Sequence, residues 1–125
     1  MKDLTDKVIG AAIEVHRVLG PGLLESIYEE ALCVELSLRD ISFERPKEVE
    51  VVYKGKRIKG QRVDLVVEKV LVVELKAVAN LPEADTAQAL SYLKATDLRR
   101  ALLINFSAVR LVDGVKEFPC KILET

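Results

Sequence analysis

Two charged residues interrupt the most hydrophobic stretch of this 125-residue chain. Glu74 and Lys76 lie within residues 70–78, where all the remaining residues are apolar. A near-continuous apolar run of this length predicts a central strand that is buried on both faces. Residues two apart on a strand point to the same face, so we expect Glu74 and Lys76 side by side. Burying either charge alone is costly, which calls for a partner, a metal ion or a phosphate nearby. An exposed structural Glu–Lys pair is the alternative.

A second carboxylate, Asp64, lies ten positions before Glu74, on the strand expected to pair antiparallel with it. Directly opposite residues of such a pair share a face, so the two carboxylates meet only if the register is even. A two-residue turn at Glu68-Lys69 would point Asp64 to the wrong face. A three-residue loop over residues 68–70, or a β-bulge, would bring the carboxylates together. A shared site therefore predicts an odd loop or a bulge here.

These residue types suit metal-assisted hydrolysis. Two carboxylates with water and a backbone carbonyl, for which Leu75 is the candidate, are the hard oxygen ligands that Mg²⁺ prefers. A lysine beside them could orient or help deprotonate an attacking water and stabilise charge developing on a phosphate. Together, Asp64, Glu74 and Lys76 describe the hydrolysis of a phosphodiester with a metal as Lewis acid.

The elements that must position these residues follow from hydrophobic periodicity and turn residues. Two helices are expected over about residues 6–19 and 23–39, separated by Gly20-Pro21-Gly22. On the second helix the broad apolar face is predicted at Leu24, Ile27, Ala31 and Val34. The expected strands cover residues 48–53, 57–67, 70–78 and 100–106.

A third helix is predicted from Pro82 to about Ala95, because proline suits the first turn of a helix. This helix would join strands 70–78 and 100–106, which makes them a parallel pair with a right-handed crossover. The tail over residues 109–118 could form a terminal hairpin. The order of elements predicts a single α/β domain over residues 1–125, with a mixed central sheet flanked by helices.

Composition limits the class of protein. Half of the residues are hydrophobic and 31% are charged, as in soluble globular domains. The apolar stretches are too short to cross a bilayer, and early charges such as Lys2 and Asp3 interrupt any signal peptide, so we expect a cytoplasmic protein. Cys33 and Cys120 lack zinc-site spacing and are expected to be small apolar residues. The net charge of −1 does not by itself indicate a nucleic-acid binder.

One segment is locally basic. From residue 54 to residue 62 the chain has no acidic residue and five basic ones, namely Lys54, Lys56, Arg57, Lys59 and Arg62. This hairpin leads directly into Asp64, so its charges would lie close to the predicted metal and could contact phosphates. A solubilising cluster that protects an exposed edge is the alternative.

The spacing of Asp64 and Glu74-Leu75-Lys76 resembles the Asp…Glu-x-Lys motif of the PD-(D/E)XK nuclease superfamily, and the order of elements looks like its core. Gly22 to Tyr28 resembles the Gly-x-x-Glu-x-x-Tyr motif of the GxxExxY proteins, a prokaryotic branch. Residues 16–22, 73–78, 92–96 and 103–106 also look like that branch, and the likeness runs from about residue 5 to residue 112. The resemblance implies a restriction-endonuclease-like fold and a nuclease that uses Mg²⁺ or Mn²⁺, on DNA more readily than RNA.

The resemblance also implies roles for residues outside the Asp…Glu-x-Lys motif. Glu25 corresponds to an acidic residue that reaches the metal site from an early helix; local capping is the alternative. Gln88 and Tyr92 resemble a Gln-x-x-x-Tyr motif that supports the site and DNA in RecB-like nucleases; a core tyrosine and a backbone-bonded glutamine are the alternative. His16 matches a metal-binding histidine on the first helix of some RecB-like nucleases, and a structural histidine is its alternative.

The sequence departs from these families at two positions, and the second departure concerns the substrate side of the site. No proline directly precedes Asp64, and neither Thr86 nor Ala87 is the histidine that the branch often has there. The leading hypothesis is thus a Mg²⁺- or Mn²⁺-dependent nuclease. A non-catalytic adaptor that keeps the fold and binds nucleic acid or protein is the alternative, and a homodimer or a subunit of a larger complex stays open.

Overall fold

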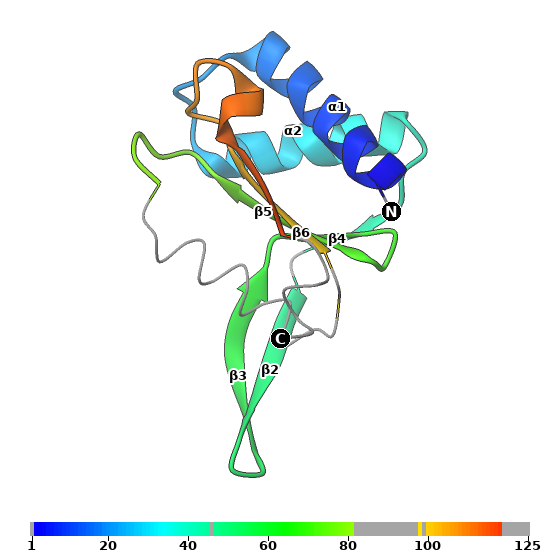
Figure 1. The fold of residues 1–125 in the computed structure, drawn as a ribbon, viewed down its shortest axis with the longest axis vertical. Helices are drawn as coiled ribbons and strands as arrows, with labels where there is room; N and C mark the ends of the chain where they lie inside the picture. Colours follow the sequence, from blue (N-terminus) through cyan, green and yellow to red (C-terminus); the bar gives the residue numbers. More distant parts are fainter. Residues whose placement is uncertain (1, 46, 82–97, 99, 119–125) are drawn as a thin grey trace.

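A mixed sheet of five strands carries the charged strand, and two helices pack on one of its faces (Figure 1). The computed structural model describes residues 2–45, 47–81, 98 and 100–118. The elements are α1 (Lys2–Leu19), α2 (Glu25–Leu38), β1 (Phe43–Glu44), β2 (Lys47–Tyr53), β3 (Lys56–Val63), β4 (Leu65–Val67), β5 (Leu71–Lys76), β6 (Arg100–Asn105), the 3-10 helix η1 (Leu111–Gly114) and β7 (Val115–Phe118). The sheet has the order β1-β4-β5-β6-β7, and β2 pairs with β3 in a separate antiparallel ribbon.

The two predicted helices are confirmed, but the buried face of α2 differs from the prediction. Helix α1 ends at Leu19, and Gly20 follows it as a glycine cap with a φ of +70°. The Gly20 N–H donates to the His16 carbonyl at 2.8 Å. The residues that α2 buries are Tyr28, Leu32, Cys33 and Leu36. The predicted face is largely solvent-exposed at Leu24, Ile27 and Val34. Since α2 has apolar residues on two faces, periodicity alone could not show which one packs on the sheet.

The central strand pair is as predicted. Strands β5 and β6 run parallel, with Glu74 opposite Leu103 and Lys76 opposite Asn105. The predicted helix between them, from Pro82 to Ala95, lies outside the described residues. The odd-numbered residues of β5 join the core under α1 and α2, where the ring of Tyr28 stacks on Phe106 at 4.5 Å. Glu74 and Lys76 are therefore on the face of β5 opposite to those two helices.

The predicted loop geometry between β4 and β5 is confirmed. Leu65 lies opposite Val73 and Val67 lies opposite Leu71, so residues 68–70 form the connection. This even register continues to Asp64 and Glu74, which are thus on the same face.

Two details of the sequence-based strand assignment are wrong. The strand predicted over residues 57–67 is divided at Asp64, because the Asp64 side chain and N–H bond to β5 rather than continuing the ladder with β2. The tail is not a hairpin: residues 111–114 form η1, and β7 pairs with β6. Leu111 is buried in the core, which holds this segment as a helical turn rather than as a strand.

Lys69→Gly is expected to stabilise the fold. Glu68 and Lys69 have φ of +51° and +62°, a left-handed conformation that strains side chains other than glycine. Glycine relieves this strain but also gives the unfolded chain more conformational entropy, which offsets part of the gain. We expect the free energy of unfolding to rise by about 0.5–1 kcal/mol. Lys69→Ala, which keeps the strain, is the control in a thermal melt. A glycine variant no more stable than the alanine variant would contradict the prediction.

Candidate active site

The carboxylates of Asp64 and Glu74 meet where β3 gives way to β4. The Asp64 N–H donates a hydrogen bond to Glu74 Oε1 at 3.0 Å, and the Leu75 N–H donates one to Asp64 Oδ2 at 2.8 Å. Only 3% of Glu74 is exposed, whereas Asp64 is half-buried. Each carboxylate thus accepts a backbone N–H from the other's strand, which fixes the two groups side by side.

The protonation of Glu74 reflects this crowding. Burial, together with the negative charge of Asp64, raises the pKa of the Glu74 carboxyl to about 8. The Asp64 N–H and the ammonium of Lys76 lower the pKa, and the charge of Glu25 raises it. Glu25 and Lys76 therefore both act electrostatically on Glu74, in opposite directions.

The backbone of β5 adds a carbonyl on the Asp64 side. The Lys76 carbonyl accepts the Phe106 N–H at 2.9 Å, toward β6. The carbonyl and N–H of one strand residue point to the same side and neighbouring residues alternate, so the Leu75 carbonyl points toward Asp64 along with its N–H. The half-buried side chain of Lys76 lies on the same face of β5 as Glu74.

The position of Glu25 is set by a clamp on the turn before α2. The Tyr28 hydroxyl donates a hydrogen bond to the Gly20 carbonyl at 2.5 Å and accepts one from the Leu23 N–H at 3.1 Å. Gly22, within this turn, has a φ of +103°, which favours glycine. The clamp holds the start of α2, so Glu25 is placed as its first residue. Tyr28 is a core residue whose hydroxyl also holds the turn before α2.

Tyr28→Phe is expected to weaken this clamp. The change leaves the ring in the core and removes the partner of the Gly20 carbonyl and the Leu23 N–H, which should lower the free energy of unfolding by about 1–3 kcal/mol. Thermal denaturation measures the loss. Tyr53→Phe, at an exposed tyrosine of β2, is the matched control and should change stability little. Equal melting temperatures for the two variants would show that the hydroxyl contacts contribute nothing.

His16, a further predicted site residue, contacts a different part of the fold. The His16 Nε2 is 2.8 Å from the Ala108 carbonyl, in the loop after β6. Across residues 2–45, 47–81, 98 and 100–118, no three His, Cys, Asp or Glu side chains group closely enough to hold a metal ion. Gln88 and Tyr92 lie outside the described residues.

Asn105 supports the site and received no role from the sequence. It is a buried polar residue at the end of β6, opposite Lys76. Its Nδ2 donates to the Val78 carbonyl at 2.9 Å, and its Oδ1 accepts the N–H groups of Val78 and Ser107, both at 3.2 Å. The amide thus ties the chain after Lys76 to the turn after β6. The sequence feature that could have indicated this role is the position of Asn105 directly after the apolar run of residues 101–104.

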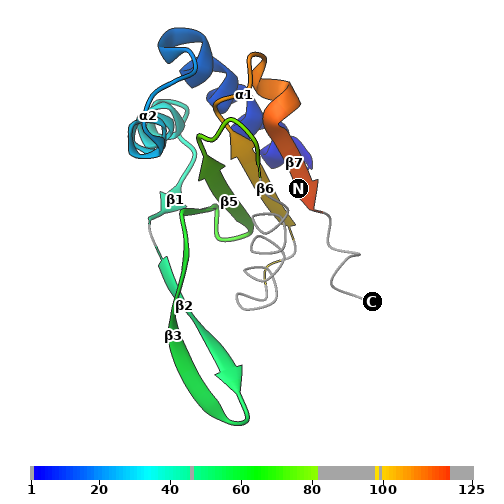
Figure 2. The same ribbon diagram turned by 90° about the vertical axis from the view of Figure 1, so that its left-hand side faces the viewer.

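The basic segment forms the ribbon of β2 and β3, which projects away from the helices and the sheet (Figure 2). Residues 51–58 are all exposed, including Lys54, Lys56 and Arg57 at and beside the tip. Lys59 and Arg62 also lie on β3, which leads into Asp64. The ribbon therefore carries exposed positive charge at its tip, and β3 runs from there to Asp64.

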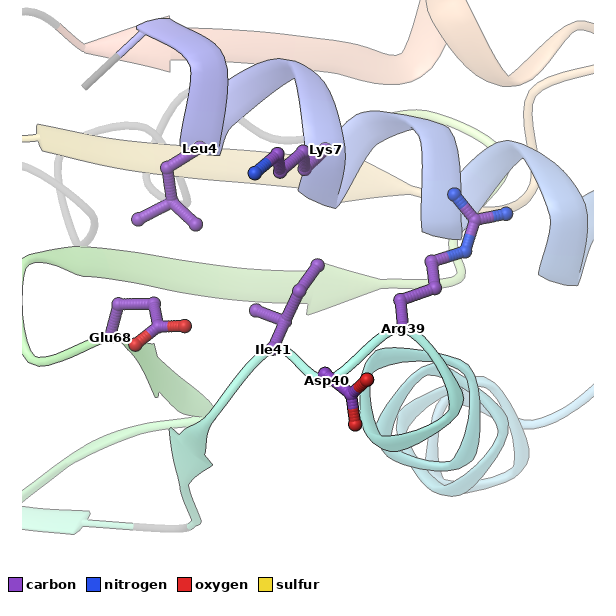
Figure 3. Close-up of a pocket in the computed structure, with 6 residues that line it drawn as sticks. All are labelled: Leu4, Lys7, Arg39, Asp40, Ile41 and Glu68. Atoms are coloured by element: carbon purple, nitrogen blue, oxygen red, sulfur yellow. The ribbon is translucent and has the colours of Figure 1, made fainter.

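A separate pocket of about 340 Å³ lies between α1, the end of α2 and the turn before β5 (Figure 3). Its lining residues are Leu4, Lys7, Arg39, Asp40, Ile41 and Glu68. The carboxylate of Glu68 is held by Ser42, whose hydroxyl donates to it at 2.7 Å. None of the predicted site residues lines this pocket, so it is distinct from the candidate active site.

Comparison with known proteins identifies the class. A family model described as the PD-(D/E)XK nuclease superfamily matches residues 2–118, and the chain belongs to this superfamily. The fold is similar to the solved structure of SSO0001, with a TM-score of 0.56 and 24% sequence identity over 75% of this chain. The match covers 48% of SSO0001, so the chain spans about half of that protein's length. A comparison with curated proteins gives no match.

The family match and the shared fold confirm the predicted mixed α/β fold of the PD-(D/E)XK type. In the part of the chain that the structure describes, no helix is long and apolar enough to cross a membrane.

Proposed function

We propose that this chain is a Mg²⁺- or Mn²⁺-dependent nuclease of the GxxExxY branch, with its active site at Asp64, Glu74, Lys76 and Glu25. The observation that carries the proposal is the nearly complete burial of Glu74 against a second carboxylate. If Glu74 had only a structural role, a neutral or ion-paired residue would be favoured at its position, since neighbouring buried carboxylates oppose each other's ionisation.

The donor set fits a hard divalent cation. Asp64 and Glu74 offer carboxylate oxygens, and the Leu75 carbonyl points to the same side. Mg²⁺ commonly takes one or two carboxylates and keeps several waters, so it needs no third side chain of the protein. When bound, such a cation would act as a Lewis acid on a phosphodiester and lower the pKa of a bound water. Its positive charge would favour the ionised form of Glu74 that burial disfavours.

The remaining residues would act on the substrate and the water. Lys76 lies on the Glu74 face of β5, where its ammonium would orient the attacking water and stabilise negative charge on the phosphate. Glu25 would complete the acidic site from the start of α2. Asn105 and Tyr28 would act as positioning residues through the backbone segments that they hold.

DNA is the proposed substrate, with RNA the less favoured one. The exposed cations Lys54, Lys56 and Arg57 lie on a ribbon that leads into Asp64, so they would contact the phosphates of a strand entering the site. Such contacts are independent of base sequence and weaken as salt is raised.

The test is Mn²⁺-dependent cleavage of a panel of single- and double-stranded DNA and RNA. Asp64→Asn should abolish cleavage, whereas Asp113→Asn, at an exposed aspartate of η1, should leave it unchanged. Circular dichroism would establish that both variants fold. No cleavage of any substrate, together with no metal-dependent rise in melting temperature, would overturn the proposal and favour a non-catalytic adaptor.

A further inference from the structure

Helix α2 carries a second apolar stripe that the fold leaves exposed. The stripe consists of Leu24 at the N-cap and of Ile27, Ala31, Val34 and Leu38. Leu24 and Leu38 at its ends are each 73% exposed, and Val34 is 59% exposed. The spacing of three and four residues is that of the a and d positions of a coiled coil, which favours packing against another helix. Ala31 is half-buried and also packs against the core. The other four residues of the stripe do not belong to the core of α2, which consists of Tyr28, Leu32, Cys33 and Leu36.

The stripe borders a groove between the two helices. This groove has a volume of about 310 Å³ and is lined by apolar residues of α1 and α2, with Glu14 and Glu35 among its lining. Val18 of α1, beside Ala31 and Val34 in the lining, is also exposed. Contiguous exposed apolar surface of this kind marks an interaction site.

The order of residue sizes in the stripe identifies the occupant. From one end to the other, the residues are large (Leu24), branched (Ile27), small (Ala31), branched (Val34) and large (Leu38). A stripe that is the same in both directions complements its own copy in antiparallel orientation, with Ala31 at the crossing. Leu24 would then lie against Leu38 of the copy, and the small central residue would let the helices approach closely. Two-fold contacts require such self-complementarity.

The charges on the two helices agree with a second copy. Four acidic side chains of α1 and α2 are each paired with an arginine of the same chain: Glu14 with Arg17 at 2.8 Å, Glu35 with Arg39 at 2.8 Å, and Glu29 and Glu30 with Arg45 at 2.9 and 2.5 Å. Two of these acids, Glu14 and Glu35, line the groove beside the stripe. Because each is neutralised by its own arginine, this edge does not attract a polyanion and does not repel an identical edge.

We propose that this chain forms a two-fold symmetric dimer through the α2 stripe, with the two α2 helices antiparallel and crossing at Ala31. The proposal does not depend on the nuclease activity, since its test measures association alone.

The first test is the mass of the protein in solution. Sedimentation equilibrium over the micromolar range should give twice the chain mass of 13.9 kDa. Val34→Lys and Leu38→Glu, at stripe residues that are 59% and 73% exposed, should each give a monomer with an unchanged circular dichroism spectrum. Val109→Lys, at an 87% exposed loop residue, should stay dimeric. A wild-type monomer at the highest concentration, or a dimer that withstands both stripe variants, would overturn the proposal.

The second test examines the antiparallel register. Leu24→Lys and Leu38→Glu should each weaken the homodimer. Mixing the two variants should restore dimerisation, because one lysine then faces one glutamate while the other Leu24–Leu38 contact stays apolar. Restoration only by mixing Leu24→Lys with a Leu24→Glu variant would indicate parallel helices and contradict the proposed arrangement.

Discussion

Glu74→Gln is expected to abolish cleavage and, at the same time, to raise the melting temperature of the metal-free protein at alkaline pH. Loss of a metal ligand should lower activity by at least about 10²-fold, since even a partner of a ligand contributes 10–100-fold. The amide has the size and polarity of the carboxyl group and carries no charge. It therefore removes the repulsion with Asp64 without leaving a cavity in the strand.

The pH dependence follows from the raised pKa of Glu74. In the folded chain this carboxyl has a pKa of about 8, compared with an ordinary value of 4.5. The folded state thus holds a proton that the unfolded state loses, and the free energy of unfolding falls as pH rises from about 4.5 to about 8. The glutamine variant lacks this loss. The two proteins should have similar stability near pH 4.5, and the variant should be the more stable above pH 8.

The size of the effect is bounded by the pKa shift. At about 1.4 kcal/mol for each pKa unit, the free energy at stake has an upper limit of about 5 kcal/mol. We expect a gain in melting temperature of about 5–10 °C above pH 8. Mg²⁺ or Mn²⁺ should raise the melting temperature of the wild-type protein at that pH and have a much smaller effect on the variant.

Glu117→Gln is the matched control, because Glu117 is exposed on β7. It should change neither the activity nor the pH dependence of stability. If Glu74 is purely structural, Glu74→Gln should instead lower the melting temperature at every pH, which would contradict the predicted rise above pH 8.

From the sequence one could derive that a shared acidic site needs an even pairing register between the strands of Asp64 and Glu74. The sequence could not show that the register is even. Asp64 and Glu74 meet because residues 68–70 form the connection between β4 and β5. In that turn Glu68 and Lys69 adopt positive φ. An Asn-Gly pair at these positions would have indicated this backbone conformation in the sequence, but Glu-Lys does not. With ordinary side chains at both positions, the choice between an even and an odd register depends on tertiary packing.

The break of the long strand at Asp64 was also invisible to the sequence. Neither glycine nor proline marks the position, and apolar alternation runs through it from Val63 to Leu65. The break arises from hydrogen bonds of Asp64 to residues of β5, which are ten and eleven positions away. Local periodicity contains no information on such contacts, whereas the central β5–β6 pair was predictable from apolar composition alone.

Lys76→Met is expected to lower the rate of cleavage by about 10²–10³-fold, the usual effect of removing one group that stabilises transition-state charge. Methionine keeps most of the apolar stem of the half-buried lysine, so the variant should fold. Because the carboxylates of Asp64 and Glu74 remain, the metal-dependent rise in melting temperature should persist. Loss of activity with metal binding retained would separate the role of Lys76 from that of the acidic pair.

Single-turnover cleavage at saturating Mn²⁺ is the measurement, with Lys69→Met, at an exposed turn lysine, as the control. The ammonium of Lys76 also lowers the pKa of Glu74, so its removal should raise that pKa above about 8 and move the pH–rate profile to higher pH. A lysine that merely pairs with Glu74 would show this pH shift and recover its full rate at alkaline pH. A rate that stays low at every pH requires the ammonium itself in the reaction.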